Sequence, residues 1–275
     1  MLFRNLYFYF DELFWKIRIN ILIILLLFKP NYKKIFQNLK NNGVAVINGY
    51  FSNEDVLNTL SLCEEEINKL EKNQVLKEIL KVDNLLLNNN VRVEKYYNSI
   101  KIKNIGNSNP NLKKLAKKNF ILNLLISFYQ FKINLSPYLI YSYTHDGNTN
   151  FLAAKSHYNS KMIAGEFHAD GYKHNIKAYI PLKDVDEENG PLTIFKSSMY
   201  DKKIQASLNN IYLTEKGILN IKNPHVIENE TIDTNRFEKY VANNKKGDLL
   251  LFDTRNIHYA SVLKKGERKI LWYYY

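Results

Sequence analysis

Hydrophobic and polar positions follow two different spacings along this chain. After Ser52 the apolar residues recur at helical intervals, which places Val56, Leu60 and Cys63 on one face of a predicted helix. After Pro137 they gather in short runs rich in Leu, Ile, Tyr and Phe, and turns that contain glycine separate these runs. The runs are LIYSY, AYIPL, PLTIF, DLLLF and KILWYYY. Helices followed by short strands predict an α+β protein with an antiparallel barrel or jelly roll in its C-terminal half.

Turn and cap signals predict further elements before this strand-rich part. Residues 43–47, GVAVI, have the pattern of a short strand, and Asn48-Gly49 then turns the chain. Ser52, with an acidic residue three positions later, is typical of a capping box, so we expect a helix to begin directly after it. Residues 113–131 carry apolar side chains at helical spacing and predict another helix.

The first thirty residues form a separate apolar and basic segment. Their longest uninterrupted apolar run, residues 21–28, is too short to cross a bilayer, because a spanning helix needs about 20 apolar residues. A signal peptide is not expected, since no small-residue cleavage site follows the run. We therefore divide the chain into residues 1–30, a helical segment, and residues 31–275, one globular domain. Two interpretations of residues 1–30 remain: a helix packed on the domain or on the second copy of a homodimer, or a peripheral membrane contact.

Composition and charge narrow the class of protein. Hydrophobic residues make up 45% of the 275 positions, which is enough to bury a core. The net charge is +12, but its source is mainly lysine spread along the chain, without an arginine-rich helix or zinc-finger spacing, so we predict no nucleic-acid partner. The one cysteine, Cys63, excludes an internal disulfide and indicates a reducing compartment. We expect a cytoplasmic protein, with membrane association as the alternative that residues 1–30 leave open.

A candidate metal site begins in GEFHADGYKHN, residues 165–175. On a strand, residues i and i+2 point to the same side, so His168 and Asp170 would face one point. An imidazole, a carboxylate and one further histidine make the facial triad that holds non-haem iron(II) and leaves coordination positions open. In a chain of this composition, His-x-Asp is expected by chance about a quarter of the time, so the motif alone is a weak signal.

Two residues near the C-terminus strengthen the metal-site hypothesis. His258 follows the apolar run DLLLF and can supply the third ligand. Arg268 directly precedes the last run, KILWYYY, and shares a predicted strand face with Trp272 and Tyr274. An arginine directed into an aromatic interior is expensive to bury unless it meets an anion, and its guanidinium pairs with a carboxylate through two hydrogen bonds. Iron ligands together with a carboxylate clamp imply a small dicarboxylic co-substrate.

These motifs, in this order, resemble the phytanoyl-CoA dioxygenase family of Fe(II)- and 2-oxoglutarate-dependent oxygenases. The resemblance extends from about Leu39 to the C-terminus and rests on LKNNGVAVINGYFSNEDV, FHAD, AYIPLKDVDEENGPLTIF and KKGDLLLFDTRNIHYAS with the arginine after it. It implies a double-stranded β-helix, the cupin-like jelly roll, supported by N-terminal helices. The implied reaction is a dioxygenase reaction that consumes O2, releases succinate and CO2, and hydroxylates a small organic or acyl- or lipid-type substrate.

The resemblance also implies the residues that bind the iron and the co-substrate. Family members often place a hydroxyl residue two positions after the distal histidine, where this chain has Ala260, so the next residue is the candidate for that role. The implied iron ligands are His168, Asp170 and His258, and the implied 2-oxoglutarate contacts are Arg268, Tyr179 and Ser261.

This chain departs from the family pattern in two places. The usual Pro-Gly-Ser-His is replaced by FKSSM at residues 195–199, and residues 1–30 lie outside the family core. Halogenating relatives lack the carboxylate ligand, so the presence of Asp170 favours hydroxylation or a related oxidation. His174 is expected in a solvated loop, with a substrate contact as the alternative. The remaining histidines are expected in surface positions, His225 among them, and Arg255 is the weaker candidate for an anion clamp.

Two alternatives to the oxygenase remain open. One is a non-catalytic β-helix module that binds a ligand. The other is a cupin-type or zinc enzyme that uses the same three ligands without an oxo acid, in which case Arg268 would be a surface residue. The partner in each case is a small molecule, and the charge of +12 favours an anionic one.

Overall fold

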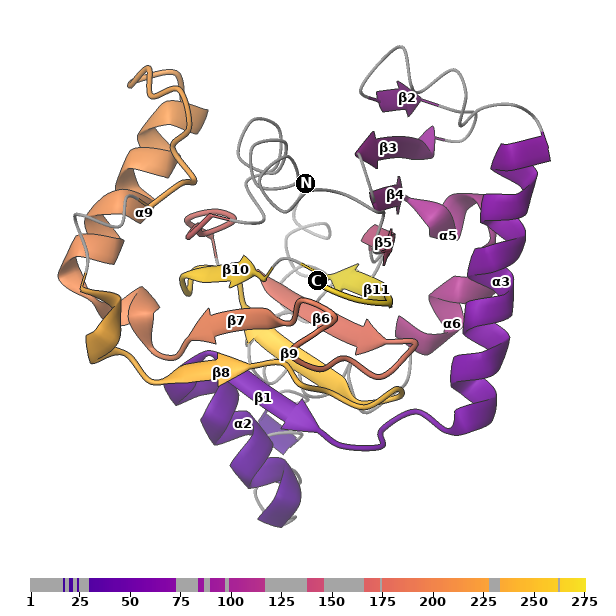
Figure 1. Cartoon of the computed structure of the whole chain (residues 1–275). Coiled ribbons are helices and arrows are strands. Elements are labelled where there is room, and N and C mark those ends of the chain that lie inside the picture. The colour runs from indigo at the N-terminus through magenta and orange to yellow at the C-terminus, as the bar shows by residue number, and fades with distance from the viewer. Residues whose placement is uncertain are drawn as a thin grey trace, which may run out of the picture.

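The computed structural model of the chain describes residues 30–72, 84–86, 90–96, 99–116, 138–145, 166–173, 175–227, 233–261 and 263–275, together with Ile17, Asn20, Ile21 and Ile24. In these residues two antiparallel sheets pack face to face (Figure 1). The larger sheet has the order β1-β9-β6-β11-β5-β4-β3-β2, and the smaller has the order β10-β7-β8. Strands distant in the sequence therefore lie side by side, which lets residues from several segments meet at one site.

The apolar runs of the sequence correspond to strands, with bounds that differ by up to two residues. The runs after Pro137 and the strand over residues 43–47 are all present. The larger sheet contains β1 (Val44–Ile47), β2 (Asn84–Leu86), β3 (Arg92–Tyr96), β4 (Ser99–Lys103), β5 (Tyr138–His145), β6 (Ile176–Pro181), β9 (Leu249–Asp253) and β11 (Glu267–Tyr274). The smaller contains β7 (Leu192–Phe195), β8 (Lys239–Val241) and β10 (His258–Ala260).

The strand register determines which side chains of the larger sheet face the smaller one. Lys177 of β6 lies opposite Phe252 of β9 on one side and Tyr274 of β11 on the other. Tyr179 and Trp272 are partners in the next row on the same face. Because cross-strand partners point to the same side of a sheet, these residues line the space between the two sheets.

The interface between the sheets is mostly apolar. The larger sheet contributes Val44, Leu250 and Ile270, and the smaller contributes Leu192 and Ile194, all of them buried. Burial of such side chains contributes about 25 cal/mol for each Å² of apolar surface removed from water. This core holds the two sheets together, and the candidate site residues lie around it.

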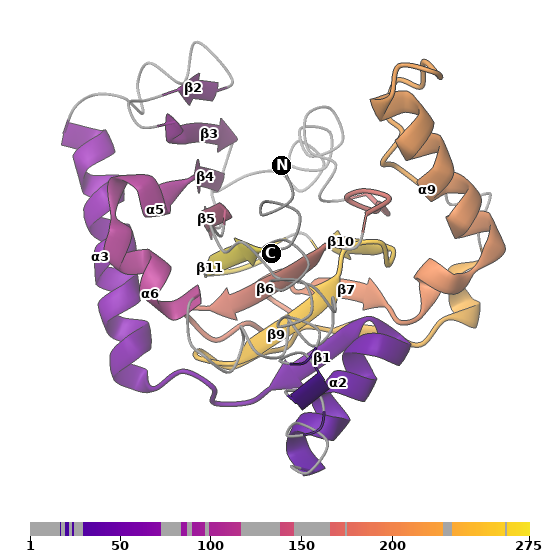
Figure 2. The same ribbon diagram turned by 180° about the vertical axis from the view of Figure 1, so that it is seen from behind.

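Helices cover the outer face of the larger sheet (Figure 2). Cys63 of α3 (Asn53–Lys72) and Ile105 of α5 (Ile105–Ser108) belong to one buried cluster with Leu271 and Tyr273 of β11. Burial raises the pKa of the Cys63 thiol, in agreement with a core residue rather than a nucleophile. Leu39 of α2 (Pro30–Asn42) and Leu112 of the 3-10 turn Pro110–Leu112 belong to the same cluster, and α6 (Lys113–Ala116) directly follows that turn.

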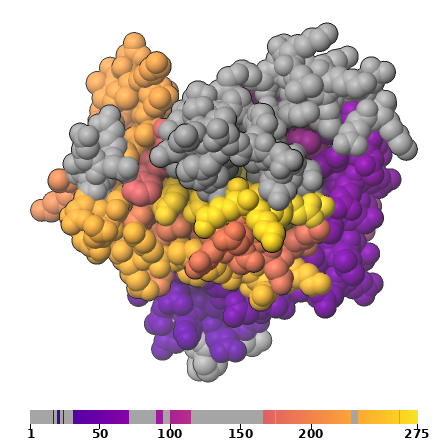
Figure 3. Space-filling view, viewed as in Figure 1, coloured from indigo at the N-terminus to yellow at the C-terminus, as the bar shows by residue number. Residues whose placement is uncertain are grey.

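Among the described residues, helix α9 (Lys202–Glu215) covers the smaller sheet. Its residues Ile204, Leu208 and Ile211 form a buried cluster with Phe195 of β7. The carboxylate of Asp201 caps α9 by accepting hydrogen bonds from the second and third amides of the helix. The space-filling view shows α9 and α3 on opposite sides of the visible face, with C-terminal residues exposed between them (Figure 3). In the described residues, further 3-10 turns span Ser198–Tyr200 and Thr234–Arg236.

The capping box at the start of α3 is confirmed. The amide of Asp55 donates to the hydroxyl of Ser52 at 3.1 Å, and the amide of Ser52 donates to the carboxylate of Asp55 at 3.3 Å. Of the helix predicted over residues 113–131, Lys113–Ala116 is helical and the remainder lies outside the described residues. Helices combined with antiparallel sheets agree with the predicted α+β class.

Most of residues 1–30 lies outside the described residues. Ile17, Ile21 and Ile24 are in helical conformation and about half exposed, at 52%, 51% and 52%. Over the described part of the chain, every helix is too short or too polar to cross a bilayer.

Candidate active site

Backbone pairing brings His168 and His258 together from segments far apart in the sequence. The amide of His168 donates to the carbonyl of His258 at 3.1 Å, and the amide of His258 donates back to the carbonyl of His168 at 2.9 Å. On its other side His168 bridges Val226. His168 was expected on a strand, but it lies in isolated bridges instead, because its neighbours Phe167 and Ala169 pair with the 225–227 segment rather than with a continuous strand.

The side chains of His168, Asp170 and His258 converge on one point. The Nε2 atoms of His168 and His258 each lie 3.6 Å from Oδ1 of Asp170, which is longer than a hydrogen bond. The three ligand atoms lie within 4.8 Å of one another, and the two imidazole rings are tilted with centroids 4.2 Å apart. Two imidazole nitrogens and one carboxylate oxygen at this separation can bind a single metal ion.

The hydrogen bonds of the two histidines leave their Nε2 atoms available. Nδ1 of His168 lies 2.8 Å from the carbonyl of Glu166, and Nδ1 of His258 lies 2.8 Å from the carbonyl of Asn256. A carbonyl only accepts, so each Nδ1 carries the proton and each Nε2 has a lone pair, as metal-binding histidines require. Nε2 of His258 is buried and has no hydrogen-bond partner among the described residues. This unsatisfied atom is the clearest sign that the site is built for a further group.

Burial keeps His168 uncharged. It lowers the pKa of His168 to about 3, with the nearby His258 acting in the same direction. A neutral imidazole is the form that binds metals, so His168 does not have to lose a proton first at neutral pH.

A lysine that the sequence analysis missed lies directly beside the candidate ligands. Nζ of Lys177 forms an ion pair with Oδ2 of Asp170. Burial alone would raise the pKa of Asp170, but the ammonium of Lys177 and the two imidazoles outweigh it and hold this pKa well below its usual range. Alternation along β6 could have placed Lys177 on the inner face, but its pairing with Asp170 depends on tertiary structure.

Arg268 and Tyr179 form a second group of polar atoms on the inner face of the larger sheet. Arg268 is buried, and its Nη1 donates a long hydrogen bond of 3.5 Å to the carbonyl of Asn189. The hydroxyl of Tyr179 is buried, and no described residue hydrogen bonds to it. Burial raises the pKa of Tyr179 while the charge of Arg268 acts against that rise, so the two groups lie close enough to interact. A guanidinium beside an unsatisfied hydroxyl suits a bound anion.

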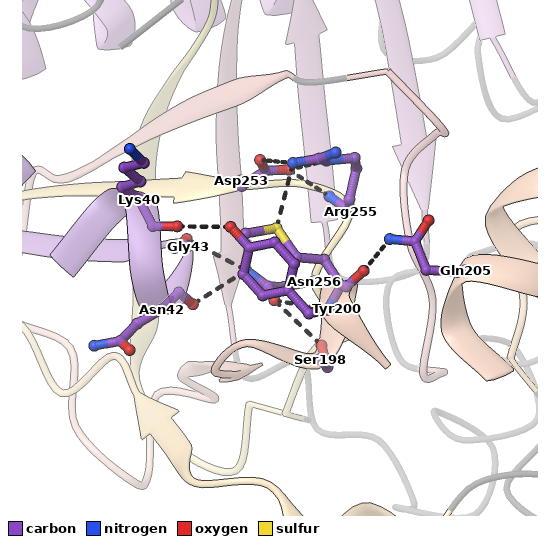
Figure 4. A network of polar contacts seen from close by, with 10 residues as sticks. Lys40, Asn42, Gly43, Ser198, Tyr200, Gln205, Asp253, Arg255 and Asn256 are labelled. Atoms are coloured by element: carbon purple, nitrogen blue, oxygen red, sulfur yellow. Dashed lines mark hydrogen bonds and ion pairs between the residues drawn. The ribbon is translucent and has the colours of Figure 1, made fainter. Parts of the chain in front are cut away.

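A polar network holds the loop that carries His258 (Figure 4). The side-chain amide of Asn256 donates to the carbonyl of Gly43 at 3.4 Å. The side-chain oxygen of Asn256 accepts from the amide of Met199 at 3.2 Å and from the hydroxyl of Ser198 at 3.3 Å. Two residues of the FKSSM segment at positions 195–199 therefore hold Asn256, which lies two positions before His258.

The structure also shows the contacts of other residues that the sequence analysis singled out. Arg255 pairs with the buried Asp253 at 2.8 Å, so its charge is already neutralised. His225 was expected at the surface, but it is partly buried and its Nδ1 lies 3.1 Å from the carbonyl of Ala169; the expectation was wrong because the 225–227 segment pairs with the metal-site motif. Ser261 directly follows β10, and its amide donates to the carbonyl of Pro191. His157 and His174 lie outside the described residues.

Comparison with known proteins identifies the fold. No protein-family model matches the chain, and no curated protein sequence matches it. The epimerase SnoN in complex with Fe3+, alpha ketoglutarate and nogalamycin RO superposes with a TM-score of 0.57 at 13% identity, over 88% of this chain and 82% of that one. The carbocyclase SnoK from nogalamycin biosynthesis gives 0.56 at 14% identity, over 88% and 83%.

A third solved structure has a similar fold. AviO1 from Streptomyces viridochromogenes Tue57 gives a TM-score of 0.55 at 12% identity, over 88% of this chain and 93% of that one. SnoN and SnoK are described as non-haem alpha ketoglutarate-dependent enzymes, and alpha ketoglutarate is another name for 2-oxoglutarate. The chain therefore shares its fold with these three structures.

Proposed function

We propose that the protein is an Fe(II)- and 2-oxoglutarate-dependent dioxygenase. The observation that carries the proposal is the convergence of His168, Asp170 and His258, with a buried and unsatisfied Nε2 on His258. These residues would hold the iron, which together with 2-oxoglutarate and O2 supplies the oxidation of a substrate C–H bond and releases succinate and CO2. A donor set of two imidazoles and one carboxylate is the one that suits non-haem iron.

The co-substrate would be held by the second polar group of the site. Arg268 would bind the far carboxylate of 2-oxoglutarate, and the hydroxyl of Tyr179, to which no described residue hydrogen bonds, would add a further contact. Ser261 remains the candidate for an additional hydroxyl contact. Burial strengthens a charged hydrogen bond and excludes water from the reacting centre. The chain's own residues thus bind, orient and shield the reactants.

We assign the domain of residues 31–275 to the phytanoyl-CoA dioxygenase type of double-stranded β-helix. The support is the two-sheet architecture, with the proximal motif before β6 and the distal histidine at the start of β10. Residues 1–30 would be an appendage that packs on the domain or on a second copy in a homodimer, or that contacts a membrane. Co-sedimentation of the full chain with anionic lipid vesicles, compared with a triple serine variant at Ile17, Ile21 and Ile24, distinguishes membrane contact from packing.

The substrate is proposed to be a small anionic molecule that is hydroxylated. Where the larger sheet extends to β4 and β3, its inner face carries charged residues instead of apolar ones. Lys101 shares its cross-strand row with Ile270 through β5, and Lys103 pairs with Arg92 in the next row. Glu94 supplies the one negative charge among them and forms an ion pair with Lys103 at 2.6 Å. The positive excess on this face favours a negatively charged substrate.

Anaerobic titration of the full chain with Fe(II) and 2-oxoglutarate tests the proposed function. We expect a weak visible absorption band from the chelate, and we expect iron-dependent succinate release that His168→Ala and Asp170→Ala abolish. A chain that binds 2-oxoglutarate without the band, or variants that still form succinate at the parent rate, would contradict the assignment.

Two alternatives predict different results in the same titration. A non-catalytic binding module gives neither the chelate band nor succinate. A cupin-type enzyme that does not use 2-oxoglutarate binds the metal ion but shows no band with the oxo acid. The burial of Arg268 disfavours the second alternative, since that enzyme has no use for a buried cation in this place.

A further inference from the structure

Lys177 is an exceptional residue in the strand that contains it. All six residues of β6, IKAYIP, are buried, and Lys177 is the one charged residue among them. Its exposed fraction is 7%. Lysine is rarely buried to this extent unless its charge is paired, because removing an ammonium from water has a large energetic cost. The position of its partner, Asp170, indicates what the lysine does.

The two oxygens of the Asp170 carboxylate have different surroundings. Oδ1 lies 3.6 Å from Nε2 of both His168 and His258, so it faces the point where the three ligand atoms converge. Oδ2 is in the ion pair with Lys177. An ion held by both histidines would therefore meet Oδ1, while Oδ2 is already engaged.

Aromatic rings fix the ammonium of Lys177 in this place. Its Nζ lies 4.5 Å from the ring centroid of Tyr274, 5.6 Å from that of Trp272 and 5.9 Å from that of Phe252. A cation within about 6 Å of an aromatic centroid is attracted to the ring. The rings come from β9 and β11, which bracket β6 in the sheet.

We propose that Lys177 is a positioning residue that occupies Oδ2 of Asp170 and thereby makes this carboxylate a one-oxygen ligand of the metal. The inference rests on the proposed function and concerns how many coordination positions stay open. An octahedral ion has six positions, and three single-atom ligands leave three of them. If Asp170 used both oxygens, only two would remain, and a keto acid that chelates through two oxygens would fill both. Lys177 would thus keep one coordination position open for O2.

The test compares two substitutions in the full chain. Lys177→Met removes the charge with little change in length, and Lys177→Arg keeps the charge. Lys269→Met is the matched control, because Lys269 is a partly buried lysine of the neighbouring strand whose ion pairs, with Glu64 and Glu267, lie away from the site. The first readout is titration with Co(II) alone, whose visible absorption changes with coordination number. The second is the affinity of the Fe(II)-loaded chain for 2-oxoglutarate without oxygen, measured from the chelate band.

The proposal predicts a specific pattern across these proteins. In Lys177→Met the Co(II) spectrum should change and 2-oxoglutarate should bind about ten- to a hundredfold more weakly, the usual range for loss of a group that orients a metal ligand. Lys177→Arg and Lys269→Met should match the parent in both readouts. A Lys177→Met protein with the parent's spectrum and affinity overturns the proposal, and so does a Lys177→Arg protein that loses affinity as much as Lys177→Met.

Folding and the proposed function are controlled separately. Circular dichroism establishes that each variant is folded, and Lys177→Gln replaces Lys177→Met if the latter is not, with the same expected pattern. If the parent chain itself binds no Co(II), the proposed function fails together with this inference. If the parent binds Co(II) and 2-oxoglutarate but Lys177→Met is indistinguishable from it, only the inference about Lys177 fails.

Discussion

The unsatisfied buried atoms of individual residues carry the functional interpretation. A buried polar atom without a partner costs about 1–3 kcal/mol, so a folded protein retains few of them without a reason. Nε2 of His258 and the hydroxyl of Tyr179 are two such atoms among the described residues, and both border the proposed reactant site. A metal ion at the first and an anion near the second would satisfy both.

Arg268 gives the sharpest prediction at the level of single residues. Arg268→Ala should weaken 2-oxoglutarate binding about a hundredfold, because a charged hydrogen bond contributes about 1.5–3 kcal/mol and a guanidinium makes two with a carboxylate. The affinity of Arg268→Lys should lie between those of the parent and Arg268→Ala, since lysine keeps the charge but cannot form the two parallel hydrogen bonds of a guanidinium. The affinity is measured from the chelate band of the anaerobic Fe(II) protein. Arg236→Ala is the control, because Arg236 is exposed and pairs with Asp201 far from the inner face. An Arg268→Ala protein with parental affinity would remove Arg268 from the site.

Local sequence signals were sufficient for much of the secondary structure. The capping box at Ser52 and the β-rich runs after Pro137 predict elements that the structure contains, because each depends on neighbouring residues alone. Helix α9 was not predicted, although the spacing of Ile204, Leu208 and Ile211 was a usable helical signal.

Parts of the candidate site were beyond sequence reasoning for a physical reason. The pairing of Lys177 with Asp170 and the support that Asn256 gives to the loop before His258 are tertiary contacts. No periodicity within one element encodes either contact. The convergence of His168 and Asp170 was expected from strand alternation. His258 was added because it follows the run DLLLF, and the resemblance to a known family supported the choice. Their binding of iron stays a prediction.

The junction between α2 and β1 gives a prediction about how elements are held together. Gly43 has φ +67°, and a Cβ built on it would lie 2.0 Å from Nδ2 of Asn256. Gly43→Ala should therefore lower the free energy of unfolding by about 2–4 kcal/mol, from the left-handed backbone and the forced shift of Asn256. It should also weaken Co(II) binding, because Asn256 supports the loop that carries His258. Denaturant unfolding and metal titration measure the two effects.

Gly49 offers a matched control for this substitution. Its φ is +58°, also left-handed, but a Cβ there would meet no atom within 4 Å. Gly49→Ala should cost about 1–2 kcal/mol of unfolding free energy from backbone strain alone and should leave Co(II) binding unchanged. If both substitutions had the same effect on stability and on metal binding, the contact between Gly43 and Asn256 would have no part in holding the site.

The whole molecule combines a general fold with a particular charge distribution. The similar structures share the architecture at 12–14% identity, and their descriptions name an epimerase and a carbocyclase, so the sheets alone do not determine the reaction. The inner face of the larger sheet carries Arg92, Lys101 and Lys103 against the single carboxylate of Glu94. These positive charges lower the free energy of unfolding, because like charges that face one another repel in the folded state.

Lys101 makes this consequence measurable through pH. Burial lowers its pKa to about 8 from the ordinary 10.5, with Lys103, Lys177 and Arg268 acting in the same direction and Glu94 against it. Below pH 8 the lysine is charged in both the folded and the unfolded chain. Between pH 8 and 10.5 the folded lysine has released its proton and the unfolded one has not, so its contribution to stability rises with pH. The unfavourable cost of the charged lysine is thus full at neutral pH and disappears in alkali.

Lys101→Met should therefore be more stable than the parent at about pH 7, and this advantage should shrink as the pH approaches 10. The free energies of unfolding in urea, measured for both proteins across this pH range, give the difference directly. Lys202→Met on α9, where the lysine is exposed, controls for the loss of one positive charge from the molecule. A Lys101→Met protein whose stability relative to the parent does not change with pH would mean that Lys101 keeps its charge in the fold. In that case the inner face would retain its full positive charge above pH 8. The affinity for an anionic substrate should then not fall as the pH rises above 8.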